Sequence, residues 1–426
     1  QLVTTDAQNN TVAGTNAGDS FTGTDANYNS LFGYNAGTAI TTGDNNTAVG
    51  FYAGLAITTG ARNTALGSDA LRIATTGSDN TAVGTNAMYY CTTASDNTAV
   101  GKSALQTNTT GSQNVAIGKD AGKSNTTGTE NVAVGDGALD ANTTGTNNTA
   151  IGRNSLTTST TASLNTGVGK DALASNSTGA LNVAVGADAL ESNTTASDNV
   201  AVRYFALNQN TTGASNIAIG RGALDANTTA SNNTGVGHNA LGANTTGIRS
   251  VALGSGALTA NTTANNNVAV GFNALNDNTT GADSTGLGSY ALAFNTTGTR
   301  NIAVGYTALY DNTTGSYNNA LGTYALQDNT TGTRNNAIGY NALYANTTGE
   351  RNVALGHETL AGNTTASYNT AVGASSLNAN TTGAQNTAIG YNTLENNTTA
   401  SFNTAVGSET LFTNTTGANN VAVGAN

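Results

Sequence analysis

Residues 125–141 read NTTGTENVAVGDGALDA, and residues 142–158 repeat the same pattern as NTTGTNNTAIGRNSLTT. The shared unit has 17 residues and can be written N-T-T-[GA]-x-x-N-x-A-V-G-x-x-A-L-x-x, numbered below as positions 1 to 17. From Ile40 onward it recurs in 23 registers, with Thr at position 3 in all 23 and Gly at position 11 in every register except that of Arg203. Self-similarity at a fixed period indicates a repeat architecture.

The unit alternates between short strand and turn signals. Runs such as NVAVG at residues 131–135 alternate at period two, which is the strand pattern. Gly at position 11 and Gly or Ala at position 4 predict turns, whereas a helical hairpin needs a unit of roughly 30 residues or more. We therefore expect an all-β fold, a parallel β-solenoid or β-roll of about 25 coils that stack at ~4.8 Å into an elongated rod on the order of 120 Å long.

The regular series defines the predicted domain organisation. Residues 40–426 form the regular 17-residue solenoid, and residues 1–39 form irregular N-terminal coils in which Gly14 and Gly33 are spaced 19 apart. The repeats run to the C-terminus without a polar capping unit, so we expect the end coils to be able to stack on another molecule.

The repeat predicts which positions turn their side chains toward the interior of the coil and which turn them toward solvent. We expect Val or Ile at position 10, with position 8 on the same side, and Leu at position 15 to face inward, beside small Ala at positions 9 and 14. Thr at position 3 is expected to face inward and Thr at position 2 outward. Asn at position 7 is expected to cap the turn before the strand.

Asn at position 1 belongs to an N-x-[ST] sequon in eighteen registers, which raises N-glycosylation as one interpretation. The first four registers, however, hold Ile40, Ile57, Ala74 and Cys91 in this column, and these residue types prefer burial. We therefore expect position 1 to face inward, with its Asn side chains hydrogen-bonded in a ladder along the stack.

Composition and charge exclude several classes of partner and chemistry. The formal net charge of −11 disfavours nucleic acid, and no apolar stretch approaches the ~20 residues that span a membrane. His238 and His357 are seven coils apart and cannot share a metal ion, and no phosphate-loop or zinc-protease motif occurs. We expect no enzymatic activity, no catalytic residue, no cofactor and no metal site.

Variable exposed positions are the predicted contact surface. Nine of the 15 tyrosines fall between Tyr290 and Tyr391. They either stack on one another as strand-surface residues or contact a partner chain, glycan or surface. The candidate contact residues are Tyr290, Tyr306, Tyr310, Tyr324, Tyr340, Tyr344 and Tyr391, together with Arg203 and Tyr204, where the glycine series is interrupted.

Short motifs of the chain resemble known repeats. NVAIG at 114–118, NVAVG at 131–135 and NIAVG at 301–305 resemble the head repeats of trimeric autotransporter adhesins, and the longer phrase NTAVGxxALxxNTTG resembles repeat regions of bacterial surface proteins and phage tail fibres. The resemblance implies a left-handed parallel β-roll, often with three chains side by side, in adhesion or as a fibre shaft.

From these features we expect a structural or adhesive subunit of an extracellular or cell-surface fibre. It is expected to self-associate end to end or as a trimer and to contact a host or surface glycan or protein. A phage tail-fibre shaft on a virion and a trimeric adhesin head are the alternatives, and an ice-binding solenoid is a distant one.

Overall fold

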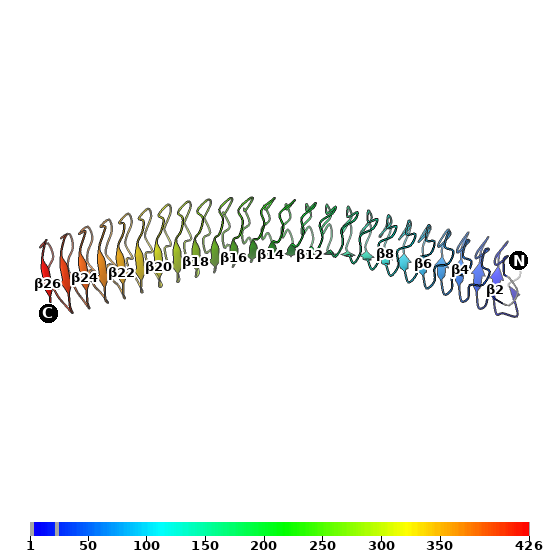
Figure 1. Ribbon diagram of the computed structural model, residues 1–426, viewed down its shortest axis with the longest axis horizontal. Coiled ribbons are helices and arrows are strands. Elements are labelled where there is room, and N and C mark those ends of the chain that lie inside the picture. The colour runs from blue at the N-terminus through cyan, green and yellow to red at the C-terminus, as the bar shows by residue number, and fades with distance from the viewer. Residues whose placement is uncertain (1–3, 22–24, 426) are drawn as a thin grey trace. The chain divides into compact units, whose positions relative to one another are not determined.

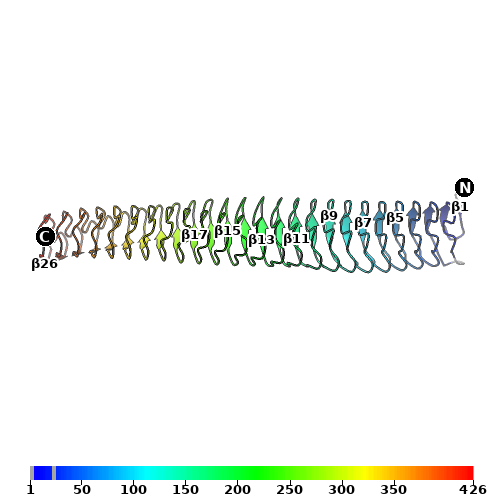
Figure 2. The ribbon, with the colours of Figure 1, turned by 90° about the horizontal axis from the view of Figure 1, so that it is seen from above.

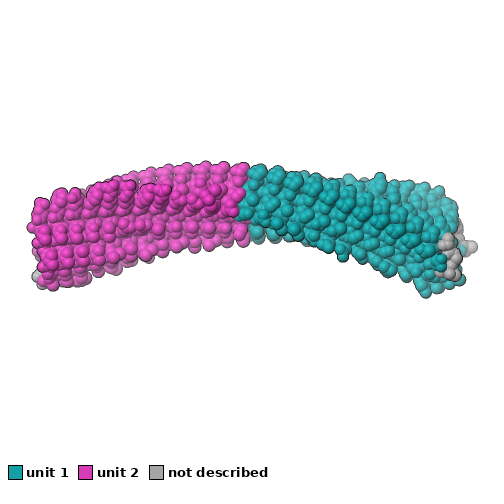
Figure 3. All heavy atoms as spheres, viewed as in Figure 1, with its two compact units in different colours: residues 1–215 teal, residues 216–426 magenta. Residues whose placement is uncertain are grey.

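The computed structural model describes residues 4–21 and 25–425, and the chain divides into two compact units, residues 1–215 and 216–426 (Figure 3). No helix occurs in the described residues. Each unit is a stack of coils in which one short strand per coil pairs with the strands of neighbouring coils (Figures 1 and 2). The predicted parallel β-solenoid of 17-residue coils is therefore confirmed for each unit. The predicted boundary between residues 1–39 and residues 40–426 stays a prediction. Residues 1–3 and 22–24 of the first region and residue 426 of the second lie outside the described part.

The strands of the first unit are β1 Thr4–Thr5, β2 Thr11–Ala13, β3 Ser30–Phe32, β4 Thr47–Val49, β5 Thr64–Leu66, β6 Thr81–Val83, β7 Thr98–Val100, β8 Val115–Ile117, β9 Val132–Val134, β10 Thr149–Ile151, β11 Thr166–Val168, β12 Val183–Val185 and β13 Val200–Val202. Strand β1 pairs antiparallel with β2, and β2 pairs parallel with β3 after a 19-residue step. From β3 onward the pairing is parallel with a 17-residue step, so that Val132, Thr149 and Thr166 lie in one row.

The strands of the second unit are β14 Ile217–Ile219, β15 Thr234–Val236, β16 Val251–Leu253, β17 Val268–Val270, β18 Thr285–Leu287, β19 Ile302–Val304, β20 Asn319–Leu321, β21 Asn336–Ile338, β22 Val353–Leu355, β23 Thr370–Val372, β24 Thr387–Ile389, β25 Thr404–Val406 and β26 Val421–Val423. All neighbouring pairs from β14 to β26 are parallel and keep the same register.

The interior of each coil is narrow and filled by small side chains and one Leu. Ala at position 9 and Ala at position 14 are buried, as in Ala116 and Ala138, and Leu at position 15 is buried as predicted, as in Leu139. Gly235 shows how close these groups lie, because a Cβ at this position 9 would be 3.4 Å from Cγ of Leu224. Beside Leu at position 15 there is little room for a side chain larger than Ala at position 9.

The predicted direction of the position 10 column is wrong. Period two correctly places positions 8 and 10 on one side of the strand, but that side faces outward, as shown by Ile117, which is 42% exposed beside fully buried Ala116. The reason is volume: Leu at position 15 already fills the interior, so the strand must turn its Ala inward and its larger residues outward.

The predicted directions of the two threonines are also reversed. Thr at position 3 is exposed, and Thr at position 2 is half-buried, as in Thr110 and Thr109. The hydroxyl of Thr109 donates to the carbonyl of Thr126 at 3.0 Å, and the hydroxyl of Thr126 donates to the carbonyl of Thr143 at 2.9 Å. Position 2 therefore turns toward the neighbouring coil because its hydroxyl satisfies a carbonyl there.

Buried asparagines form two hydrogen-bonded columns. At position 1, Nδ2 of Asn125 donates to Oδ1 of Asn108 at 2.8 Å and to the Gly128 carbonyl at 3.0 Å, which confirms the predicted inward ladder. At position 7, the backbone and side-chain N–H groups of Asn131 donate to Oδ1 of Asn114 at 3.0 and 3.2 Å. The asparagines at position 7, which were predicted to cap the turn before the strand, thus form a second buried hydrogen-bonded ladder. Both columns satisfy polar groups that the narrow interior would otherwise bury unpaired.

Glycine at position 11 is required by the backbone. Gly118 has a φ of +138°, and a Cβ there would lie 2.4 Å from the carbonyl oxygen of Gly135 in the next coil. Arg203 occupies this position with a φ of 95°, and its backbone N–H still donates to the Val185 carbonyl at 2.7 Å. Arg203 therefore keeps the register of the stack in a backbone region that non-glycine residues rarely adopt.

Candidate contact surfaces

The outer side of the strands is an aliphatic surface, which we call the sheet face and define as positions 8 and 10 of each coil. Position 10 is always Val, Ile or Leu from β4 to β26, and position 8 is Thr, Val, Ile or Asn. Many of these aliphatic side chains are well exposed, among them Leu66, Ile117, Ile151 and Val185 in the first unit and Ile219, Leu253, Ile302 and Leu321 in the second. Neither position carries a charge, and position 10 forms a continuous aliphatic file on each unit, beside position 8, where aliphatic residues are mixed with Thr and Asn.

A second surface, the tyrosine ridge, lies on the turn that follows the strand in the second unit. We define it by Tyr290, Tyr306, Tyr310, Tyr324, Tyr340 and Tyr344, which occupy positions 12, 13 and 16 of successive coils. Tyr306 contacts Tyr324 and Tyr324 contacts Tyr340, with ring centroids 5.7 and 5.8 Å apart and the rings nearly perpendicular. Tyr290 contacts Tyr310 at 6.0 Å. Five of the seven predicted tyrosines therefore belong to two connected rows of rings, and Tyr344 joins them by lining the same hollow as Tyr324 and Tyr340.

Three residues of the ridge were not predicted. Phe272 contacts Tyr290 at 5.3 Å, Phe294 contacts Tyr310 at 4.8 Å, and the His357 imidazole stacks on Tyr340 at 5.2 Å. They occupy positions 12 and 17 of neighbouring coils. The sequence would have indicated them if all ring side chains, and not tyrosine alone, had been assigned to their positions in the repeat.

Two hollows open on the ridge. One, of about 350 Å³, is lined by Tyr324, Gln327, Tyr340, Asn341 and Tyr344. The other, of about 80 Å³, is lined by Asn273, Asn276, Asp277, Tyr290, Ala293, Phe294 and Tyr310. Both combine aromatic rings with amide groups, which is the type of lining that binds small polar molecules with an apolar side.

Carboxylates lie beside the ridge and perturb its hydroxyls. Burial, followed by the neighbouring charge of Asp311, raises the pKa of Tyr310, whereas the charge of Asp328, followed by burial, raises the pKa of Tyr344. Burial also raises the pKa of Asp311 and of Asp328. The hydroxyls of Tyr310 and Tyr344 are thus neutral hydrogen-bonding groups at physiological pH.

The remaining predicted contact residues do not join this ridge. Tyr391 is half-exposed and lies three coils beyond Tyr340, outside the connected rings. Arg203 and Tyr204 belong to the first unit, where the Tyr204 ring contacts that of Phe205 at 4.1 Å. The sequence had grouped these residues by composition, and the structure brings together only the six ridge tyrosines.

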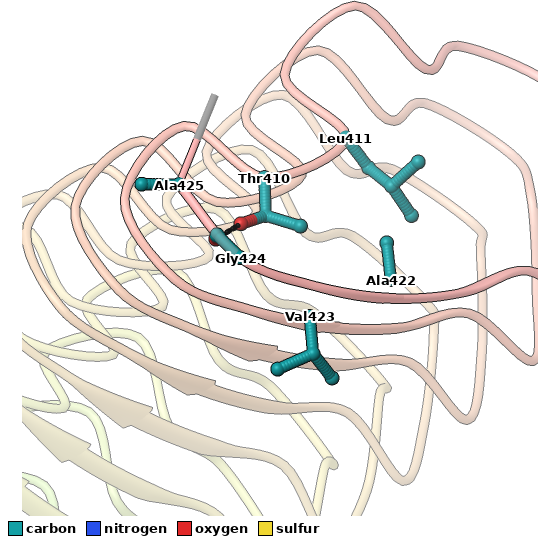
Figure 4. A pocket seen from close by; sticks show the side chains of 6 residues that line it. All are labelled: Thr410, Leu411, Ala422, Val423, Gly424 and Ala425. Carbon is teal, nitrogen blue, oxygen red and sulfur yellow. Dashed lines mark hydrogen bonds between the residues drawn. The ribbon is translucent and has the colours of Figure 1, made fainter.

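A hollow of about 270 Å³ lies on the last described coil (Figure 4). It is lined by Thr410, Leu411, Ala422, Val423, Gly424 and Ala425, and the Thr410 hydroxyl donates to the Gly424 carbonyl. Leu411 and Ala422 occupy positions 15 and 9, which are interior positions in every preceding coil. This hollow is the cross-section of the coil interior and carries no separate chemistry.

Ionisable side chains do not gather into a reactive cluster. Within the described ranges, no group of three or more His, Cys, Asp or Glu is placed to hold a metal ion. Cys91 is buried, and burial raises the pKa of its thiol to about 12, so it behaves as a small apolar residue. Over those same residues there is no helix of the length and apolarity that a membrane span requires.

Comparison of the sequence with models of known protein families and with curated proteins gives no match. What is known of the chain is therefore its regular 17-residue β-solenoid repeat, its sheet face and its tyrosine ridge.

Proposed function

We propose that the chain is a structural and adhesive repeat protein, a subunit of an extracellular or cell-surface fibre whose chains associate side by side through the sheet face. The observation that carries this proposal is the uninterrupted file of outward-facing aliphatic side chains at position 10 in both units, of which the Ile and Leu members are exposed and most Val members half-buried. Large exposed apolar surfaces on soluble proteins typically mark interaction sites. Here the surface repeats with the coils.

A second copy of the chain is the partner that such a surface fits. Every copy presents the same apolar groups at the same rise of ~4.8 Å per coil, so the files of two copies can interdigitate along their length. The absence of charge at positions 8 and 10 keeps direct like-charge contacts out of this interface, although each copy has a net charge of −11.

The resemblance of NVAIG and NVAVG to adhesin head repeats and fibre regions supports the extracellular or virion location and the adhesive role. A tail-fibre shaft and a trimeric adhesin head are the alternatives, and the resemblance implies side-by-side chains for both. No catalytic role is proposed, because His238 and His357 are seven coils apart and no acidic cluster accompanies them.

Sedimentation of matched variants tests the proposal. The sheet-face variant carries Ile117→Lys, Ile151→Lys and Val185→Lys. The control carries Gln113→Lys, Asn147→Lys and Leu181→Lys at position 6 of the same three coils, where other coils already hold arginine, such as Arg249 and Arg300. We expect the wild type and the control to sediment as multiples of 42.2 kDa and the sheet-face variant to shift strongly to the monomer.

A wild type that sediments as a monomer at every concentration contradicts the proposal, as does equal dissociation of the two variants. Circular dichroism before the run confirms that the added lysines leave the strands folded. Because lysine on an exposed face costs little stability, loss of assembly at full β-signal identifies the sheet face as the interface.

A further inference from the structure

The tyrosine ridge has the geometry of a binding surface for a chain of sugars. We propose that it binds a neutral polysaccharide that lies along the coils of the second unit. This inference names the partner of the adhesive role proposed above and rests on that role, but it concerns a different surface from the one that joins copies of the chain.

Ring orientation is the first argument. Tyr306, Tyr324 and Tyr340 meet edge to face, with interplanar angles of 80° and 76°, so no two of these rings are stacked flat on each other. Tyr306 and Tyr340 are each nearly half exposed, although the His357 imidazole stacks on one face of Tyr340. The ring surface that stays exposed suits the flat C–H side of a pyranose ring, which is apolar while its rim is polar.

Polar groups beside the rings are the second argument. In the larger hollow, Nε2 of Gln327 lies 3.5 Å from the Tyr344 hydroxyl and 3.5 Å from Oδ1 of Asp328, at the limit of a hydrogen bond, while its Oε1 accepts from the Thr307 hydroxyl at 3.2 Å. The amide is thus oriented by one good bond, and its two long donor contacts are ones that a sugar hydroxyl in the hollow can replace. Asn341 and the Tyr344 hydroxyl add further groups that can bond to sugar hydroxyls.

Charge selects a neutral ligand over an acidic one. The residues that line the two hollows include Asp277 and no lysine or arginine, and the carboxylates of Asp311 and Asp328 lie beside Tyr310 and Tyr344. A sulfated or uronic polymer would bring further negative charge to this surface without a cation to pair it.

The spacing of the rings along the ridge is the argument for a polymeric ligand. Rings recur on successive coils from Phe272 to His357, and coils repeat at about 4.8 Å along the stack. A pyranose unit in an extended chain advances by a similar length, so successive sugars meet successive coils. Because the sugars belong to one polysaccharide chain, their individually weak contacts with the ridge add up to a higher overall affinity.

Native affinity electrophoresis tests the proposal with three soluble polymers in the gel: hydroxyethyl cellulose, a galactomannan and, as the acidic comparison, heparin. We expect at least one of the two neutral polymers to retard the wild type and heparin not to. The ridge variant Tyr324→Ala/Tyr340→Ala is expected to weaken the retardation at least tenfold. The control Tyr317→Ala/Tyr368→Ala removes two exposed tyrosines from position 6 of the same unit and is expected to keep it.

Failure of both neutral polymers to retard the wild type overturns the proposal, and so does equal retardation of the ridge and control variants. If the double variant unfolds, Tyr340→Ala alone, at an exposed ring, gives the same comparison. Sedimentation of the ridge variant separates the two proposals: it is expected to assemble like the wild type, because the sheet face is untouched.

Discussion

Two stretches of the first unit fill the same interior column, position 1, with different types of side chain. In the coils of residues 40–107, position 1 is Ile40, Ile57, Ala74 or Cys91, whereas the following coils place Asn in that column except at Ser159. All of these side chains are buried. The Thr ladder of position 2 and the Asn ladder of position 7 continue through both stretches, as shown by Thr58 bonding to Thr75 and Asn63 to Asn46.

In the apolar stretch, the volumes of positions 15 and 1 compensate each other. Where position 15 is Gly54, the following position 1 is Ile57, whose Cδ1 would lie 3.0 Å from a Cβ on Gly54. Where position 15 is Leu71, the following position 1 is the smaller Ala74. The amide stretch does not follow this rule strictly, since Gly122 is followed by Asn125. The comparison teaches that the interior of a coil accepts either an apolar or an amide column.

A charge in the amide column is expected to have the largest effect. Asn125→Asp replaces the Nδ2 group that donates to Asn108 and Gly128 by an acceptor, and buries a carboxylate against their oxygens. We expect the free energy of unfolding to fall by about 3 kcal/mol at pH 7. Burial raises the pKa of such a carboxyl, so the loss is present above the folded-state pKa and shrinks as pH falls through it.

Urea denaturation at pH 7 and pH 4.5 measures this loss, with Thr127→Asp at exposed position 3 of the same coil as the control. The control is expected to change stability by less than about 0.5 kcal/mol. Equal effects of the two substitutions would show that the column does not depend on its donors.

Moving an amide into the apolar stretch is expected to have a smaller effect. In Ile57→Asn the new side chain can donate to the Gly60 carbonyl, as Asn125 does to Gly128, but Ile40 and Ala74 offer no amide above or below it. It also leaves the space beside Gly54 empty. We expect a loss of about 2–3 kcal/mol by urea denaturation.

Ile57→Val is the matched control, since it removes one methylene without adding a polar group and is expected to cost about 1 kcal/mol. A loss for Ile57→Asn no greater than that of the control would show that an isolated amide is accepted as readily as a ladder member, against the view that the columns must be uniform.

Periodicity predicted the fold because every coil repeats the same information. The inward direction of position 1 followed from Ile40 and Ile57, and that of position 15 from its Leu column. The direction of the strand could not be predicted from period two alone, because Ala116 and Ile117 differ in burial only through the space that position 15 leaves. Hydrophobicity favoured Val and Ile inside, and steric volume placed them outside.

The surfaces were predicted in part. Six tyrosines of the ridge were recognised from their density, whereas Phe272, Phe294 and His357 were missed because they were judged singly and not by register. The sheet face was missed altogether, since its residues had been assigned to the core. Position 3, invariant as Thr, is exposed, and nothing in the structure explains its invariance.

Repairing an interruption in the amide column is expected to have the smallest effect and the opposite sign. Ser159 occupies position 1 between Asn142 and Asn176, and its hydroxyl is too short to continue the ladder. Within the described part of the chain, Oδ1 of Asn142 and the Ser159 hydroxyl oxygen are buried without a hydrogen-bond partner. Ser159→Asn is expected to supply the missing donor to Asn142 and an acceptor for Asn176.

Replacing two unsatisfied groups by hydrogen bonds is expected to raise the free energy of unfolding by about 1 kcal/mol, a gain that urea denaturation resolves. Ser175→Asn, the same change at the exposed position 17 of the same coil, is expected to leave stability unchanged. If both substitutions raised the free energy of unfolding equally, the gain would come from replacing serine by asparagine and not from the ladder. A gain confined to Ser159→Asn would show that continuity of the ladder, beyond burial of each amide, is what distinguishes this stretch from the apolar coils that precede it.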